Sequence, residues 1–151
     1  MEEERSFRHS KSFGERCEYA AIAELLKRGL DVYKTLVDDR GIDCIVRINN
    51  KRYIDIQIKA RSKNVREGDE AFFAGLEILP RENFFYIFYS EYLDTFWVIP
   101  SRDVVKKAWK AKSGENVGTY NIYLIGHKKG KAYPLDRYKK YENENGFALL
   151  K

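Results

Sequence analysis

Residues 42–60, IDCIVRINNKRYIDIQIKA, decide the fold because they contain two alternating patterns separated by a turn signal. Side chains alternate between the two faces of a β-strand, so every second residue shares a face. The residues that form one apolar face in this way are Ile42, Cys44, Val46, Ile48, Ile54, Ile56 and Ile58. Asn49-Asn50 lies between the two runs and is typical of a turn. The stretch therefore predicts a β-hairpin with one apolar face.

The apolar face also selects the register of this hairpin. A three-residue loop, 49–51, sets Cys44 opposite Ile56, and the apolar faces of the two strands then coincide. A two-residue loop would set Asp43 opposite Ile56 and would mix the faces. A buried face specifies the register strongly, so we expect the three-residue loop. In that register Asp43 lies directly opposite Gln57, with Cβ atoms roughly 5 Å apart, and one metal ion could touch both side chains.

The polar face of the hairpin has two interpretations. A strand with alternating polar residues is ordinarily a half-solvated strand and nothing more. Two observations favour a functional site. Gln57 is the only glutamine of the chain, so glutamine is not a general surface residue here. The second observation is the helix upstream, described next. Lys59 shares a strand face with Gln57, so a carboxylate at Asp43, an amide and an ammonium are expected at one place.

The segment upstream of the hairpin predicts a helix over 13–28. Ser12 is the expected N-cap, and Glu15 three residues later completes a capping-box pattern. Gly29 is the expected stop. The residues at helical spacing on one side are Glu18, Ile22, Leu25 and Leu26. A carboxylate on that side lies either at the rim of the interface or beside a cation. Together with Asp43 and Lys59, Glu18 is better explained as a site residue.

The order of these residues resembles the PD-(D/E)xK nuclease superfamily over about residues 13–61. The residues that match are Gly14, Glu18, Gly29, Asp43 and the run Gln57-Ile58-Lys59. The similarity is greatest to the branch with a Gln-x-Lys motif, which includes small intron-encoded homing endonucleases. The resemblance implies a restriction-endonuclease-like core of the α/β (α+β) class, with a central mixed β-sheet flanked by helices. It also implies hydrolysis of DNA phosphodiester bonds with Mg²⁺ or Mn²⁺.

The resemblance assigns roles to individual residues. The implied catalytic residues are Glu18, Asp43, Gln57 and Lys59. The implied metal ligands are Asp43, the Gln57 side chain, the Ile58 carbonyl and Glu18, and Lys59 would orient the attacking water. Two positions depart from the usual motif. Ile42 replaces a proline, and Gln57 replaces an acid, which removes one negative charge from the metal site.

The remainder of the chain predicts alternating strands and helices, consistent with a mixed sheet. We expect strands over 31–37, 84–89, 95–99 and 120–125. We also expect a helix or buried segment over 69–79, a helix capped by Ser101 that runs to residue 111, and a short helix over 135–141. With 151 residues, we expect one nuclease-like domain, 13–151, after a flexible segment, 1–12.

The charge of the chain favours a polyanionic partner. The net charge is +5, and the sequence pI is about 9.1. Arg61, Lys63 and Arg66 directly follow the expected site, so we expect them to contact DNA phosphates. Two further basic runs, 106–112 and 128–131, are explained equally well as solvated surfaces.

Other features bear on compartment and assembly. The chain has no apolar N-terminal stretch and no run long enough to span a membrane, and Cys17 and Cys44 are expected to be buried free thiols, so we expect a cytoplasmic protein. One site cuts one strand, so cleavage of a duplex calls for a homodimer or a higher even-numbered oligomer. Two functions remain: a metal-dependent DNA endonuclease, and a non-catalytic or regulatory nucleic-acid-binding module on the same fold.

Overall fold

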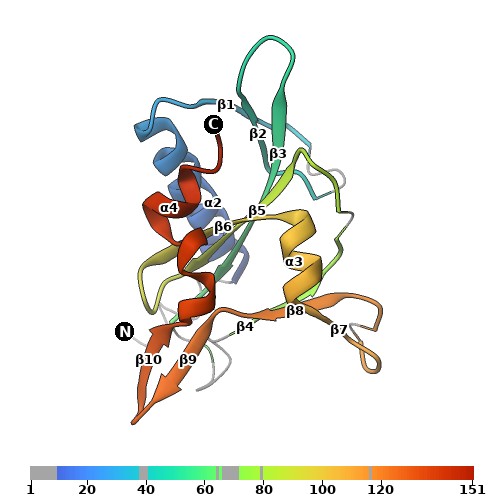
Figure 1. The fold of residues 1–151 in the computed structure, drawn as a ribbon, viewed down its shortest axis with the longest axis vertical. Coiled ribbons are helices and arrows are strands. Elements are labelled where there is room, and N and C mark those ends of the chain that lie inside the picture. The colour runs from blue at the N-terminus through green and yellow to red at the C-terminus, as the bar shows by residue number, and fades with distance from the viewer. Residues whose placement is uncertain (1–9, 38–40, 64, 66–71, 79, 116) are drawn as a thin grey trace.

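A five-stranded mixed sheet forms the centre of the computed structural model, which describes all residues except 1–9, 38–40, 64, 66–71, 79 and 116 (Figure 1). The strand order is β1-β2-β3-β5-β6. Their bounds are Asp31–Lys34 for β1, Cys44–Arg47 for β2, Tyr53–Arg61 for β3, Phe84–Ser90 for β5 and Thr95–Pro100 for β6. β3 and β5 run parallel, and the other neighbouring strands are antiparallel. The prediction of a central mixed sheet flanked by helices is therefore confirmed.

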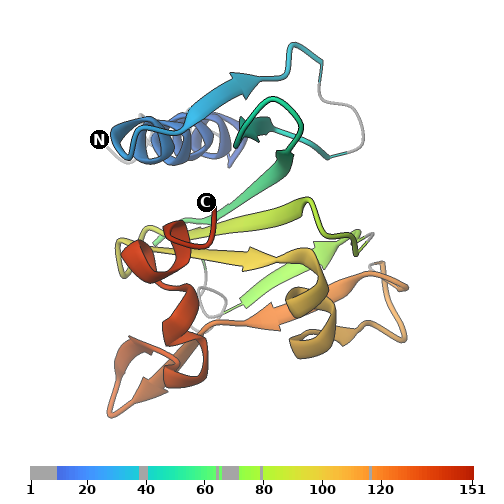
Figure 2. The same ribbon diagram turned by 45° about the horizontal axis from the view of Figure 1, so that its top comes forward.

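One face of this sheet packs against α2 (Ser10–Lys27), as Figure 2 shows. The core between them includes Ala21, Ile22, Leu25, Cys44, Val46, Ile54, Ile56 and Ile58. The helix ends at Lys27, and Gly29 follows with a φ of 77°, which is accessible because glycine has no Cβ. The Gly29 N–H donates to the Leu26 carbonyl and the Leu30 N–H to the Leu25 carbonyl, which is the pattern of a Schellman cap.

The other face of the sheet is covered by α3 (Ser101–Lys107), a 3₁₀ helix η2 (Asp136–Tyr141) and a three-stranded sheet. That sheet has the order β4-β8-β7, with bounds Phe72–Leu76, Tyr120–Tyr123 and Trp109–Lys110. The core on this side is strongly aromatic; it includes Phe73, Phe84, Tyr86, Phe88, Trp97, Tyr138 and Tyr141. The aromatic strands predicted from the sequence are therefore buried on both faces.

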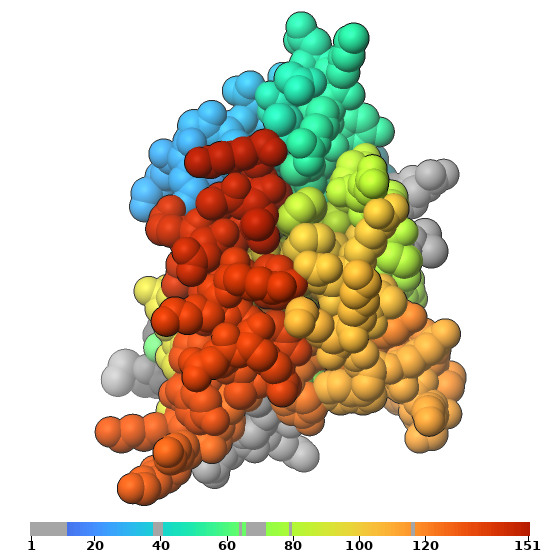
Figure 3. Space-filling view, in the orientation of Figure 1, coloured from blue at the N-terminus to red at the C-terminus, as the bar shows by residue number. Residues whose placement is uncertain are grey.

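The C-terminal part of the chain wraps around β6. β9 (Ile125–Lys128) and β10 (Lys131–Pro134) form a small hairpin, and α4 (Asn143–Phe147) then crosses to the α2 side of the sheet. Glu142 forms a β-bridge with Trp97, and the Asn143 side-chain oxygen accepts the Phe96 N–H at 3.0 Å. Gly146 packs so closely that an added Cβ would overlap the Tyr141 carbonyl. In Figure 3 the C-terminal residues, coloured red, occupy the visible face below the blue residues near the N-terminus.

The hairpin has the register predicted from its apolar face. Cys44 pairs with Ile56 and Val46 pairs with Ile54, and the turn lies between β2 and β3. The strand predicted over 84–89 is β5, and the strand predicted over 95–99 is β6. Both cysteines are buried and free, as expected. Among the described residues, no helix is both long and apolar enough to cross a membrane.

Several local predictions were wrong. α2 begins at Ser10, so Ser12 lies inside the helix and is not its N-cap. Leu26 is 55% exposed, because the buried stripe of α2 runs through Cys17 and Ala21 instead. Of the two alternatives for 69–79, the helix was wrong and the buried segment was right, because the described part contains the strand β4, with Phe73 and Leu76 buried, which pairs with β8 far along the chain. α3 ends at Lys107, and residues 109–110 form β7.

Candidate functional site

The candidate site lies where β3 continues beyond its partner β2. β2 pairs with β3 over residues 53–56, whereas β5 pairs with it over 55–61. Asp43 precedes β2 and reaches across this gap. Its Oδ2 accepts the Ile58 N–H at 2.7 Å, and its own N–H donates to the Ile56 carbonyl at 2.8 Å. The N–H and C=O of a strand residue point to the same side, so the Ile58 carbonyl lies at the same edge as the carboxylate.

Gln57 lies against the chain just before Asp43. Gly41 has a φ of 70°, and a Cβ added to it would lie 3.0 Å from Gln57 Nε2. Only a glycine lets the backbone pass over the amide at this distance and in this conformation. Gln57 therefore lies beside Gly41, but Asp43 does not pair directly opposite Gln57 as predicted, because the Asp43 N–H bonds to the Ile56 carbonyl and the ladder of β2 and β3 stops at Cys44 and Ile56.

Gly41→Ala should lower the free energy of unfolding by roughly 1–2 kcal/mol, because an L-residue in the left-handed region is strained. The added Cβ should also push the Gln57 amide away from Asp43. We expect this displacement to weaken Mn²⁺ binding, and calorimetric titration measures that affinity. Gly130→Ala is the matched control, since Gly130 has a φ of 76° and no heavy atom within 4 Å of an added Cβ. We expect the control to lose stability and keep its Mn²⁺ affinity; equal affinity in both variants would contradict the prediction.

Glu18 approaches the site from α2 and forms an ion pair with Lys34 of β1. Lys34 Nζ lies 2.5 Å from Glu18 Oε1, and the two side chains are 40% and 21% exposed. The hydrogen bond to Glu18 raises the pKa of Lys34, and the charge of Asp43 raises it further. Both alternatives for Glu18 therefore hold, because it lies at the rim of the interface and also has a cationic partner.

Cys44 of β2 lies next to Asp43 and is affected by the same charges. Burial raises the pKa of its thiol to about 12, and the negative charges of Asp43 and Glu18 add to that rise, whereas Lys34 opposes it. Lys59 lies on β3 two residues beyond Gln57, and its side chain is half-buried. None of the described residues forms an ion pair with Lys59, so its ammonium is not held by a carboxylate of the described chain.

The oxygen donors of this site fit a hard divalent cation. Mg²⁺ prefers carboxylate, amide and carbonyl oxygens, needs only one or two carboxylates, and keeps several waters. Asp43 and Glu18 supply the carboxylates, and Gln57 and Ile58 supply neutral oxygens. Within the described chain, no group of three or more His, Cys, Asp and Glu residues is placed to hold a metal. A metal here would therefore depend on the neutral oxygens.

The three predicted phosphate contacts have different surroundings. Arg61 ends β3, and its guanidinium lies 5.3 Å from the centre of the Phe72 ring. Lys63 is exposed in the turn after β3, where its N–H donates to the Glu91 carboxylate at 3.1 Å. Arg66 lies outside the described residues. Arg61 and Lys63 thus follow the site at one end of β3.

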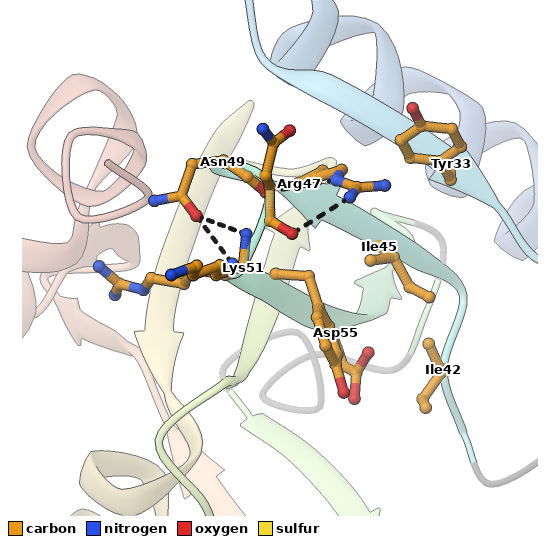
Figure 4. Close-up of a pocket in the computed structure, with 10 residues that line it drawn as sticks. Tyr33, Ile42, Ile45, Arg47, Asn49, Lys51 and Asp55 are labelled. Carbon is orange, nitrogen blue, oxygen red and sulfur yellow. Dashed lines mark hydrogen bonds between the residues drawn. The ribbon is translucent and has the colours of Figure 1, made fainter.

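Two adjoining hollows extend from the site over the polar face of the hairpin. A cleft of about 1110 Å³ is lined by Gly41, Gln57, Asp55 and Arg81, with Lys110 and Tyr120 from the smaller sheet. A second pocket of about 660 Å³ lies under the hairpin loop, and Figure 4 shows Asp55, Ile42 and Ile45 around it. The two hollows share Ile42, Tyr53 and Asp55. Arg47, Lys51 and Arg52 give the second pocket a basic rim.

Three residues of this region were not predicted from the sequence. Asp55 could have been found, because it alternates onto the same face of β3 as Gln57. Lys34 and Arg81 give no local signal. Lys34 reaches the site because β1 pairs with β2, and Arg81 reaches it because the segment before β5 crosses Asp55.

Comparison with known proteins identifies the fold. No family model matches the chain, and no curated protein matches its sequence. Among solved structures, the chain is similar to that of a bacterial homing endonuclease. That protein is I-Ssp6803I; it is 23% identical, the match covers 93% of each chain, and the TM-score is 0.62. The mixed α+β fold of this chain, with a central sheet flanked by helices, is therefore similar to the fold of a homing endonuclease.

Proposed function

We propose that this protein is a metal-dependent endonuclease that hydrolyses DNA phosphodiester bonds, as a PD-(D/E)xK enzyme with a Gln-x-Lys motif. The observation that carries the proposal is the Asp43 carboxylate bonded to the Ile58 N–H, between Gln57 and Lys59 on β3. The shared fold with a homing endonuclease supports it.

Each site residue has a task in this proposal. Asp43, Gln57, the Ile58 carbonyl and Glu18 hold Mg²⁺ or Mn²⁺. The ion would polarise the scissile phosphate and make a water more acidic. Lys59 orients the attacking water and offsets the charge that develops on the phosphate oxygens. Arg61, Lys63 and Arg66 bind neighbouring phosphates, and two copies of the chain act together on a duplex.

A second candidate function is DNA binding without cleavage. The observation that favours it is the ion pair between Lys34 and Glu18, which satisfies one of the two carboxylates with an ammonium. Gln57 is neutral and stands where the usual motif has an acid. The site therefore carries less negative charge than a site with a third acid at that position. A site of this kind would recognise DNA and retain little affinity for a divalent cation.

Incubation with supercoiled plasmid separates the two functions. In Mg²⁺ or Mn²⁺ the wild-type protein should convert the plasmid to nicked or linear forms, and chelation by EDTA should stop the conversion. Gel mobility in Ca²⁺, without turnover, reports binding separately. A protein that shifts the plasmid but leaves it supercoiled in both active metals would contradict the nuclease and support the binding function.

A further inference from the structure

A buried ion pair joins β3 to the segment before β5, beside the candidate metal ligands. Asp55 is only 6% exposed, and its Oδ2 accepts a hydrogen bond from Arg81 Nη2 at 2.5 Å. An unpaired buried carboxylate is costly, so this arginine compensates it. Asp55 lies two residues before Gln57 on the same face of β3. The pair is therefore next to the site already described.

Arg81 is held from three sides. Its guanidinium lies 4.8 Å from the centre of the Phe84 ring, in addition to its bond with Asp55. Its backbone is fixed by the buried Ser101 hydroxyl, which accepts the Arg81 N–H at 3.1 Å and donates to the Arg81 carbonyl at 2.9 Å. A guanidinium fixed in this way loses little conformational freedom when it binds a further group.

Arg81 has N–H donors that no hydrogen bond to a described residue occupies. The guanidinium has five N–H donors, and to the described residues it makes the one hydrogen bond with Asp55. Its side chain is 39% exposed and lines the same cleft as Gln57, with Lys110 on the other wall. Glu77 also lines the cleft, so the two cations are balanced by two acids. Because the charges of the cleft cancel, Arg81 would attract DNA only weakly from a distance. Its contribution would come from hydrogen bonds donated in a fixed direction.

We propose that Arg81 binds a DNA phosphate next to the one at Gln57, with Asp55 as its positioning residue. This inference rests on the proposed function, because it assigns the substrate of the same cleft. A planar guanidinium matches two phosphate oxygens and binds them with paired hydrogen bonds. The cleft, at about 1110 Å³, exceeds a typical small-molecule pocket and suits a segment of backbone. A purely structural ion pair would affect stability and leave DNA affinity unchanged.

Fluorescence anisotropy with two labelled duplexes of different sequence, in Ca²⁺ to prevent cleavage, tests the proposal. Arg81→Gln alone would leave the Asp55 carboxylate buried without a partner. The decisive comparison is therefore between the double variant D55N/R81Q and the single variant D55N. Both variants lack the Asp55 charge, and only the double variant lacks Arg81. We expect the double variant to bind both duplexes roughly tenfold more weakly. The slope of log affinity against log salt should fall by about 0.9, equal to one phosphate contact.

Arg102→Gln is the matched control, because Arg102 follows Ser101, which contacts the Arg81 backbone, but it lies outside the cleft lining and pairs with Glu82. We expect the control to bind like the wild type. Equal affinity and slope for D55N/R81Q and D55N would overturn this inference alone. A loss confined to one duplex would also overturn it, since it would indicate recognition of a base. Failure of the wild type itself to bind either duplex would instead count against the proposed function.

Discussion

Asp43→Asn should lower the affinity of the protein for Mn²⁺ by at least about 10- to 100-fold, because even residues that only support metal ligands contribute that much. Because Gln57 is neutral, we expect Asp43 to supply the main ionic ligand. Asparagine keeps a side-chain oxygen that can accept the Ile58 N–H, so the fold should be retained. Calorimetric titration with Mn²⁺ measures the affinity, and circular dichroism checks the fold.

Two further variants make this measurement specific. Gln57→Glu should strengthen Mn²⁺ binding, because it restores a negative charge at the same position. Asp31→Asn removes one carboxylate from the exposed start of β1, away from the ligands, and should leave the affinity unchanged. A folded Asp43→Asn protein that binds Mn²⁺ as tightly as the wild type would exclude Asp43 as a ligand.

Lys59→Ala should reduce the rate of plasmid cleavage by about 100- to 1000-fold, as the loss of one preorganised donor to a transition state does. The free energy of unfolding should change little, because the side chain is half-exposed and makes no ion pair with a described residue. DNA affinity in Ca²⁺ should also be nearly unchanged, since the proposed role of Lys59 concerns the water and the transition state.

The control for Lys59 is Lys27→Ala, which removes the same charge from α2, where the lysine side chain is 71% exposed. Cleavage by this variant should match the wild type. If Lys59→Ala cut plasmid at the wild-type rate, the catalytic group would have to be sought elsewhere. If it lost DNA binding and cleavage in proportion, Lys59 would be a binding residue.

The hairpin could be predicted from the sequence because the residues that determine its register are close together in the chain. Alternating isoleucines define the buried face of β3, and only one register buries the matching face of β2. Gly29 could be predicted as the stop after α2 for the same reason, since a positive φ favours glycine. That register also placed Asp43 next to β3, the strand that carries Gln57.

The exact contact at the site could not be predicted from alternation. Pairing of β2 and β3 ends before Asp43, so its carboxylate takes the backbone N–H of Ile58 and does not simply face Gln57 across a ladder. Alternation describes paired strands, and it fails where one strand ends. The position of the Asp43 carboxylate thus depends on the point where the pairing of β2 with β3 ends.

Other differences arise from distant parts of the chain. Segment 69–79 is apolar without a clear period, and its strand β4 is fixed by pairing with β8. Serine is a favoured helix cap, and Ser101 was predicted to cap the helix after β6. Its hydroxyl instead binds the backbone of Arg81 and makes no cap hydrogen bond. In both cases a long-range partner overrides the local preference.

The wrapping of the C-terminal residues around β6 limits how two copies of this chain could assemble. An outer strand with unpaired backbone groups can add the strand of another molecule, but Glu142 and Asn143 already occupy that position on β6. At the opposite side of the sheet, β1 offers only four residues, with Asp31 and Lys34 at its ends. The described part of the five-stranded sheet therefore offers little backbone for two copies to share. If the proposed nuclease acts as a dimer, this sheet would contribute side-chain contacts, and each copy would bind one strand of the duplex.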